Sequence, residues 1–142
     1  MVKVSIIMPV YNDEEFLDKS IGTVLKQSLD DIELICVNDG STDKSLEVLN
    51  KYCEEYDFIK VLSQKNQGSG KARNYGLRES SGNYIAFLDA DDIYIDGKAL
   101  EMLYETAAKN DANMVSGNIK LVNAKGEFSP SPHWTTTPSM AS

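Results

Sequence analysis

The stretch Val4-Ser5-Ile6-Ile7-Met8-Pro9-Val10 decides the fold, because it is a short apolar run rich in β-branched residues. Successive apolar positions over such a length are typical of a strand that is buried on both faces of a sheet. Sheets buried in this way are mostly parallel and carry helices on each face. The stretch therefore predicts a central strand at residues 4–10 and an α/β fold around it.

The rest of the chain repeats this pattern, because strand-like runs alternate with segments whose apolar residues recur at helical spacing. Such alternation implies right-handed crossovers and a mostly parallel sheet with helices on both faces. We predict strands at 4–10, 32–37, 59–62, 84–88 and about 114–122, and helices at about 16–25, 46–56, 70–79 and 100–107.

Polar residues follow three of the predicted strands. Tyr11-Asn12 comes after the first, Asn38-Asp39 after the second and Asp89-Ala90-Asp91-Asp92 after the fourth. The economical strand order 3-2-1-4 places the first and fourth strands side by side at a topological switch point. Because ligands of such sheets bind beyond the carboxyl ends of the strands, we predict a binding site on this rim.

The run Asp89-Ala90-Asp91-Asp92 places three carboxylates within four residues, directly after an apolar strand. These groups repel one another unless a cation or proton intervenes, and Mg²⁺ or Mn²⁺ suits carboxylate ligands. Such an ion could screen a diphosphate and make it a better leaving group. Alternatively, one aspartate caps a turn and the others are solvated, which is the usual outcome for an isolated pattern of this kind.

Two other motifs could serve either structure or function. Asp39 could cap a turn, with Ser41 or Thr42 capping the next helix, or its carboxylate could accept hydrogen bonds from a base or a ribose. Tyr11 could pack in the ordinary way or offer a flat platform for a base. Asn12 stands where a capping box would begin the first helix.

The stretch from Gly68 to Arg73 is similar to a phosphate loop only at first sight. Lys65 stands where the P-loop pattern needs glycine, and Ala72 stands where it needs serine or threonine. Arg73 stands where the dinucleotide pattern needs a small residue. What remains is a basic helix start at Lys71 and Arg73, with backbone N–H groups that could meet an anion.

The composition is that of an ordinary globular domain, with 142 residues, 42% of them hydrophobic and a net charge of −8. This acidity disfavours binding to nucleic acid. Cys36 and Cys53 match no metal or disulfide spacing, so we interpret them as reduced thiols and expect a cytoplasmic protein. We expect no signal peptide, and no apolar run approaches the ~20 residues of a membrane span.

Five runs of the chain form one combined pattern. They are Pro9-Val10-Tyr11-Asn12, Asn38-Asp39-Gly40-Ser41-Thr42-Asp43, Asn66-Gln67-Gly68, Ala72-Arg73-Asn74-x-Gly76 and Phe87-Leu88-Asp89-Ala90-Asp91-Asp92. Taken together, these runs resemble the family 2 glycosyltransferases. The resemblance covers about residues 4–122 and implies a GT-A fold, which is a Rossmann-like α/β sheet. It also implies a nucleotide-sugar donor, usually a UDP-sugar, and inverting, metal-dependent transfer to a hydroxyl acceptor.

The resemblance implies roles for single residues. Tyr11 would stack on the base, Asp39 would hydrogen-bond it, and Arg73 would line the nucleotide pocket. Asp91 would be the principal ligand of Mn²⁺ or Mg²⁺, with Asp89 and Asp92 beside it. The complete nucleotide-binding set would be Pro9, Val10, Tyr11, Asp39, Lys71, Arg73, Asp89 and Ala90.

One part of the family pattern has no match here. Family members carry a downstream acid that acts as general base on the acceptor hydroxyl, and the late acids Asp111 and Glu127 stand in no such motif. We therefore expect a truncated GT-A half at 1–125, which holds mainly the donor site, and a Ser/Thr/Pro-rich tail or linker at 126–142.

The identity of the partners follows from the same resemblance. The acceptor would be a saccharide or a lipid-linked molecule, which leaves open a peripheral position of the full-length protein on the inner face of the membrane. One alternative is a module that binds a nucleotide-sugar without catalysis. Another is a signalling domain with Mg²⁺ around a modified Asp39, which would need an acidic pair where Pro9-Val10-Tyr11-Asn12 stands.

Overall fold

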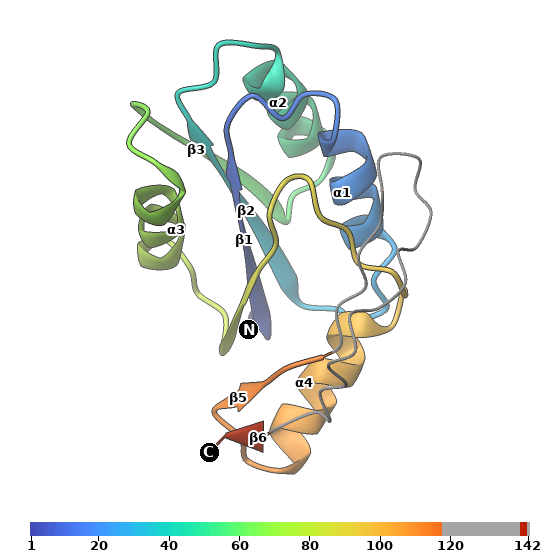
Figure 1. Cartoon of the computed structure of the whole chain (residues 1–142). Coiled ribbons are helices and arrows are strands. Elements are labelled where there is room, and N and C mark those ends of the chain that lie inside the picture. The colour runs from blue at the N-terminus through green and yellow to red at the C-terminus, as the bar shows by residue number, and fades with distance from the viewer. Residues whose placement is uncertain (118–139, 142) are drawn as a thin grey trace, which may run out of the picture. The chain divides into compact units, whose positions relative to one another are not determined.

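A four-stranded parallel sheet in the order β3-β2-β1-β4 forms the centre of the first part of the chain (Figure 1). The computed structural model describes residues 1–117 and 140–141, and the chain falls into two units, 1–101 and 102–142. The predicted strand order and parallel α/β sheet are confirmed. The strands are β1 (Val4–Val10), β2 (Ile32–Asp39), β3 (Ile59–Gln64) and β4 (Tyr84–Phe87).

Strand β1 lies at the centre of the sheet, as its apolar sequence predicts, and every one of its residues is buried. It pairs with β2 from Val4 opposite Ile32 to Val10 opposite Asn38, and with β4 on its other side. Both neighbours run parallel to it. The carboxyl ends of these strands therefore meet at one edge of the sheet, where the sequence predicts a binding site.

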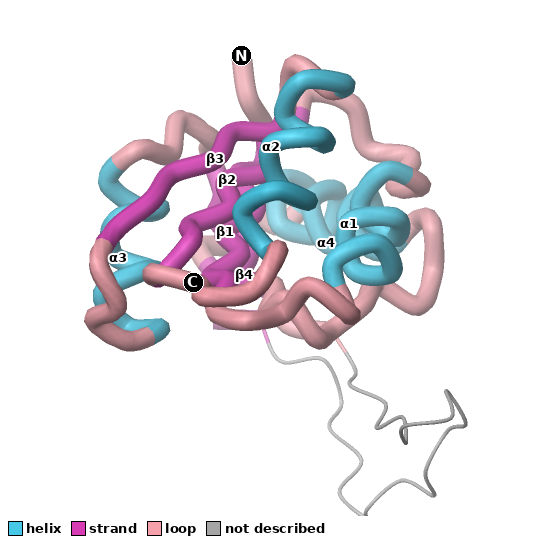
Figure 2. Tube along the Cα trace, turned by 90° about the horizontal axis from the view of Figure 1, so that it is seen from above, coloured by secondary structure: helices cyan, strands magenta, loops and turns pink. Residues whose placement is uncertain are grey.

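Three helices connect these strands and cover both faces of the sheet (Figure 2). Helix α3 (Ser69–Arg78) lies against β1 and β2 on one face. Helices α1 (Leu17–Leu25) and α2 (Ser45–Glu55) lie on the other face. The predicted covering of the sheet by helices on both sides is confirmed.

The starts of two helices differ from the sequence prediction. Helix α1 begins at Leu17 and α2 at Ser45, and no side chain caps either start at the preceding residue. The predicted capping roles of Asn12, Ser41 and Thr42 are therefore wrong. Asn12 has a left-handed φ of 51° and joins two loops instead, because its hydrogen-bond partners lie about 30 residues along the chain.

The second unit contains most of helix α4 (Ala99–Lys109) and a small antiparallel sheet. In this sheet β5 (Met114–Val115) pairs with β6 (Met140–Ala141). The predicted strand at 114–122 is described only at its start, and Glu127 and most of the predicted tail lie outside the described residues. Within the described part of the chain, no helix combines the length and apolar character needed to cross a membrane.

Helix α3 approaches the sheet closely at Gly76. A Cβ atom at this position would lie 2.7 Å from Cγ2 of Ile7 and 3.3 Å from Cγ2 of Val37. Ile7, Val37 and Ala72 are fully buried, so the surrounding atoms have little room to shift. The missing side chain thus lets α3 sit directly on β1 and β2, with Arg73 one turn away on the same helix.

A buried carboxylate joins three strands at the opposite, amino-terminal edge of the sheet. Glu33 on β2 accepts hydrogen bonds from Ser5 Oγ on β1 at 2.6 Å and from Lys60 Nζ on β3 at 2.8 Å. The N–H of Ser81, just before β4, donates to the same carboxylate at 2.7 Å. Burial raises the pKa of Glu33, but the hydrogen bonds from Lys60, Ser5 and Ser81 outweigh burial and lower it to about 2.

Gly76→Ala is expected to destabilise the protein by about 1–3 kcal/mol, because the added methyl group overpacks the contact with Ile7. Gly70→Ala, in the same helix, is the matched control, since apart from its own stretch of the helix backbone nothing lies within 4 Å of its Cβ position. It should stabilise by up to about 1 kcal/mol through helix propensity. Urea unfolding of both variants measures the difference, and a Gly76→Ala protein as stable as Gly70→Ala would contradict the packing account.

Glu33→Gln is expected to lower the free energy of unfolding at pH 7 by on the order of 3 kcal/mol, the equivalent of a pKa shift from 4.5 to about 2. Because the folded-state pKa is the lower one, this stabilisation is complete above about pH 5 and disappears as the pH falls towards 2. Urea unfolding between pH 7 and pH 3 should therefore show a smaller gap between wild type and variant at low pH.

Glu47→Gln serves as the control for this measurement. Glu47 forms an exposed ion pair with Lys51 at 3.6 Å, so its loss should cost less than about 1 kcal/mol. A Glu33→Gln protein that matches this control at pH 7 would show that the buried network does not stabilise the sheet.

Candidate functional site

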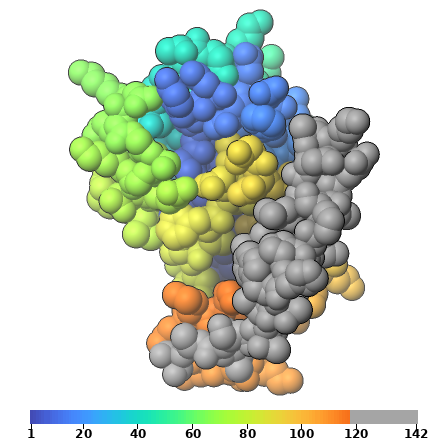
Figure 3. Space-filling model, viewed as in Figure 1, coloured from blue at the N-terminus to red at the C-terminus, as the bar shows by residue number. Residues whose placement is uncertain are grey.

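A cleft of about 410 Å³ opens at the carboxyl-terminal edge of the sheet, within the first unit. Its walls come from the turn after β1, the end of β2, the loop between β3 and α3, and the acid run 89–92 after β4. Figure 3 shows part of this arrangement, since the yellow surface after β4 adjoins the blue surface of the turn after β1. The cleft therefore lies at the predicted switch point.

Most of the predicted site residues lie together around this cleft. Lys71 and Asp92 are the exceptions, because neither lines it. Lys71 is an exposed residue of α3, whereas Asp92 lies beside the cleft within the acid run. The predicted residues that line the cleft are Pro9, Val10, Tyr11, Asp39, Arg73, Asp89, Ala90 and Asp91.

The structure adds four lining residues to the predicted set: Asp13, Asn66, Gly68 and Ser69. Asn66 and Gly68 belong to a run that carries the family resemblance, so that run was the available signal for them. Asp13 stood in no motif. Its position becomes clear only from the turn after β1, where the N–H of Tyr11 donates to Asp13 Oδ2 at 2.9 Å.

Asp39 is almost fully buried at the end of β2. It binds the loop between β3 and α3. Its Oδ1 accepts hydrogen bonds from Gln64 Nε2 and the N–H of Gln67, both at 2.8 Å. Its Oδ2 accepts from the N–H of Gly68 at 3.0 Å. A carboxylate has about four acceptor positions, so these donors leave one on Oδ2.

The charge of Asp39 is maintained by the same donors. Burial raises the pKa of this carboxyl, but the hydrogen bonds from Gln64, Gln67 and Gly68 outweigh burial and lower it. Asp39 is therefore an ionised acceptor at neutral pH. The alternative in which Asp39 caps the turn that follows it is wrong, because Asn38 Oδ1 accepts from the N–H of Ser41 at 3.2 Å in that turn, whereas Asp39 binds the loop before α3. Asp39 also lines the cleft.

Asn12 fastens the turn that carries Tyr11 to the loop after β2. Its Oδ1 accepts hydrogen bonds from the N–H groups of Thr42 at 2.8 Å and Asp43 at 3.2 Å. Its own N–H donates to Ser41 Oγ at 3.1 Å. These bonds fix the turn, while Tyr11 remains 47% exposed and offers a flat aromatic surface at the edge of the cleft.

The acid run forms a short turn at the end of β4. The N–H of Leu88 donates to the Ile7 carbonyl at 3.0 Å, and the N–H of Asp92 donates to the Asp89 carbonyl at 3.0 Å. Arg73 Nη2 pairs with Asp89 Oδ1 at 2.8 Å, which links the run to α3. This ion pair occupies one oxygen of Asp89.

The carboxyl groups of Asp13, Asp89, Asp91 and Asp92 lie near one another at this edge of the cleft. Burial raises the pKa of Asp92, and the neighbouring charges of Asp91 and Asp89 raise it further. Burial likewise raises the pKa of Asp13, and the charges of Asp91 and Asp89 also raise it. A bound divalent cation would relieve this repulsion.

The three aspartates of the run fit a divalent cation. Asp89, Asp91 and Asp92 each offer a carboxylate oxygen, and these oxygens lie within 4.8 Å of one another. Ligand oxygens on opposite sides of Mg²⁺ are about 4 Å apart, so only small side-chain rotations are needed. Because Asp91 and Asp92 are exposed, further positions around an ion would stay open to a ligand.

These features together define what the cleft can bind. The Tyr11 ring suits a flat ring, and Asp39 suits a group with an N–H donor. Arg73 and the acids of the run belong to the same lining, and an anion bridged by a metal would fit beside them. The ligand is therefore expected to combine an aromatic ring with a strongly anionic group.

Comparison with known proteins agrees with this description. The model of the family described as Glycosyl transferase family 2 matches residues 5–140. The poly(ribitol-phosphate) beta-glucosyltransferase of Bacillus spizizenii is 36% identical over 129 residues, which are 88% of this chain and 20% of that protein.

Two solved structures share the fold. Residues 1–349 of S. aureus TarS, in complex with UDP-GlcNAc, superpose with a TM-score of 0.74 at 30% identity and cover 80% of this chain and 33% of that one. The mannosyltransferase PcManGT from Pyrobaculum calidifontis, in complex with GDP-Man and Mn²⁺, has a TM-score of 0.70 at 22% identity and covers 75% and 32%.

The family resemblance and the GT-A fold expected from the sequence are thus confirmed. The chain spans about a fifth to a third of the length of these three proteins. Its family match, in contrast, extends over nearly the whole chain. By sequence and by fold, the chain belongs to glycosyl transferase family 2.

Proposed function

We propose that the chain binds a nucleotide-sugar donor, most consistent with a UDP-sugar, in the cleft at the end of the sheet. The full-length protein would transfer the sugar to a hydroxyl acceptor with inversion. The observation that carries this proposal is the single cleft that combines Tyr11, Asp39 and Arg73 with the acids Asp89 and Asp91. The UDP-GlcNAc complex of TarS, at 30% identity, supports the choice of donor class.

Each wall of the cleft has a distinct part in this proposal. Tyr11 stacks on the base, and Asp39 accepts a hydrogen bond from it through Oδ2. Arg73 lines the nucleotide pocket and holds Asp89, while Lys71, outside the lining, adds positive charge near the start of α3. Pro9, Val10 and Ala90 complete the lining around the nucleotide.

The proposed metal site consists of Asp91 with Asp89 and Asp92. When bound there, Mn²⁺ or Mg²⁺ would supply positive charge to the diphosphate and so stabilise it as a leaving group. The protein's own contribution is to hold the carboxylates close together and to keep exposed positions for the donor. The Mn²⁺ complex of PcManGT shows that a protein of this fold binds that ion.

The acceptor side of the reaction requires groups other than those of the cleft. We propose that the acceptor is a saccharide or a lipid-linked molecule. The reaction also needs a general base, which no motif of this chain supplies. The chain alone is therefore expected to bind the donor without transferring the sugar. A general base must lie opposite the leaving group and within hydrogen-bond reach of the hydroxyl. We place the full-length protein in the cytoplasm, where it could associate with the inner face of the membrane.

UDP with Mn²⁺ is expected to raise the melting temperature of the chain, because a ligand that binds only the folded state stabilises it by about 2.7 kcal/mol at 100 times its Kd. The increase should shrink without Mn²⁺ and in Asp91→Asn, which loses a ligand charge. Asp57→Asn is the control, since Asp57 is an exposed residue just before β3, at the opposite edge of the sheet.

Calorimetry with the same ligands gives the affinities directly. An Asp91→Asn variant that keeps the full dependence of UDP affinity on Mn²⁺ would exclude Asp91 as a ligand. A wild-type chain that binds UDP equally well with and without a divalent cation would contradict the metal-bridged site as a whole.

UDP is expected to bind at least about tenfold more tightly than CDP, with the same Mn²⁺ concentration in both titrations. The remaining acceptor position of Asp39 suits the ring N–H of uracil, whereas cytosine has no such donor and would leave a buried carboxylate oxygen facing an acceptor. Both ligands carry the same diphosphate, so the comparison isolates the base. Equal affinities would show that Asp39 only supports the loop.

A further inference from the structure

The segment that follows the acid run, residues 94–101, is attached to the end of helix α1 and to the residues just after it. The N–H of Tyr94 donates to Thr23 Oγ1 at 3.1 Å. The N–H of Ser28 donates to the Gly97 carbonyl at 2.7 Å. These residues are about 70 positions apart in the sequence, so the attachment is a tertiary feature that no local motif would indicate.

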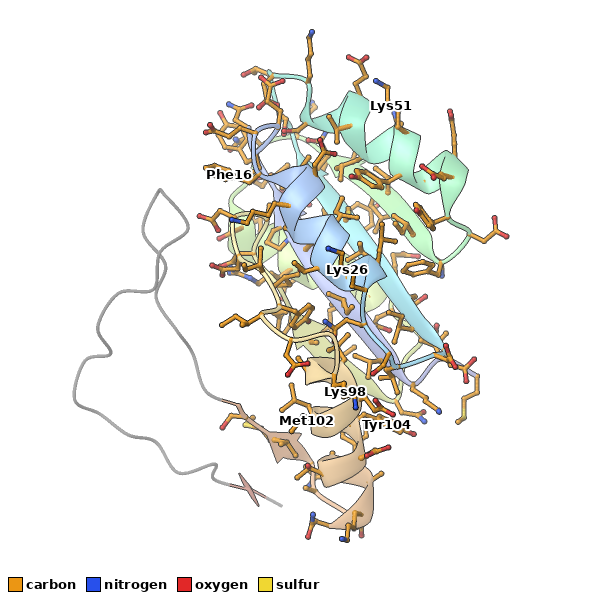
Figure 4. All side chains as sticks on the ribbon, turned by 90° about the vertical axis from the view of Figure 1, so that its right-hand side faces the viewer. Phe16, Lys26, Lys51, Lys98, Met102 and Tyr104 are labelled. Atoms are coloured by element: carbon orange, nitrogen blue, oxygen red, sulfur yellow. The ribbon has the colours of Figure 1, made fainter. Side chains whose placement is uncertain are left out.

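Gln27 uses both ends of its side-chain amide in this attachment. Its Nε2 donates to the Asp96 carbonyl at 2.9 Å, and its Oε1 accepts from the N–H of Leu100 at 3.0 Å. In Figure 4, Lys26 marks the end of α1, and Lys98 marks the attached segment close to it. The side chain of Gln27 thus holds the segment at two points four residues apart.

This attachment fixes one end of the acid run. At the other end, the N–H of Leu88 donates to the Ile7 carbonyl and so continues the pairing with β1. A single residue separates Asp92 from Tyr94, whose N–H is bound by Thr23. The run is therefore a short turn held between strand β1 on one side and helix α1 on the other.

The restraint matters because the acids of the run repel one another. If the segment after Asp92 were free, the turn could open and carry the carboxylates of Asp89, Asp91 and Asp92 apart. With both ends fixed, their oxygens stay within 4.8 Å of one another. Metal sites whose ligands are held in this way by surrounding hydrogen bonds bind their ion more tightly.

We infer that Thr23 and Gln27 are positioning residues for the divalent-cation site and act through the backbone of residues 94–100. They touch neither the proposed ion nor the cleft. The inference rests on the proposed function, because it assumes that the acid run binds the cation. It assigns a task in the affinity for metal to one residue of helix α1 and to one residue just after that helix.

The test compares Thr23→Val, which keeps the shape of the side chain but loses the hydroxyl, with Thr23→Ser, which keeps the hydroxyl. Gln27→Ala removes the second attachment. Electron paramagnetic resonance of free Mn²⁺ gives the affinity for Mn²⁺ in the presence of UDP, and calorimetry gives the affinity for uridine, which carries no phosphate.

The expected result is about a tenfold weaker affinity for Mn²⁺ in Thr23→Val and in Gln27→Ala, the lower end of the range for residues that support metal ligands. Thr23→Ser should restore the wild-type value. Uridine affinity should be unchanged in all three variants, because Tyr11 and Asp39 are held by separate hydrogen bonds.

Three outcomes would overturn the inference. The first is wild-type affinity for Mn²⁺ in variants whose melting temperature has fallen, which indicates a purely structural role. The second is an equal loss of uridine and Mn²⁺ affinity. The third is a wild-type chain that binds no Mn²⁺ with UDP, which rejects the proposed function as well. Should Gln27→Ala fail to fold, the matched pair at Thr23 decides the question.

Discussion

Parallel pairing of β1 with both of its neighbours is the constraint on which the rest of the structure depends. Because β2 and β4 run in the same direction as β1, their carboxyl ends bring Asp39 and the acid run to the same edge as Tyr11. Helix α3 then sits on β1 and β2 through Gly76, which places Arg73 beside Asp89. The cleft is a direct consequence of this topology.

Side chains that bind backbone groups convert this topology into a defined site. Asn12 joins the turn after β1 to the loop after β2, and Asp39 holds the loop before α3. Gln27 holds the segment after the acid run. Glu33 performs a similar task at the opposite edge of the sheet, far from the cleft. Loops that carry binding residues are thus tied to rigid elements rather than left to their own conformational preferences.

The sequence is a good guide to the sheet and to the location of the site, because buried parallel strands are apolar runs and switch points follow from strand order. It is a poor guide to the hydrogen bonds of the loops. Asn12 has the spacing of a helix cap, yet its partners lie about 30 residues away. Gln27 lies just after helix α1 and stands in no motif, and two of its partners lie 69 and 73 residues away. Local patterns contain no information on such pairs.

The central claim is that the carboxyl-terminal edge of the sheet binds a nucleotide diphosphate together with a divalent cation. The most direct test is the change in backbone amide chemical shifts when Mg²⁺ and UDP are added together. The account predicts large changes at Tyr11, Gly68 and Asp91 around the cleft and small changes at Ser81 and Gly82 at the opposite edge. Changes that spare the cleft, or that concentrate at Ser81 and Gly82, would contradict it.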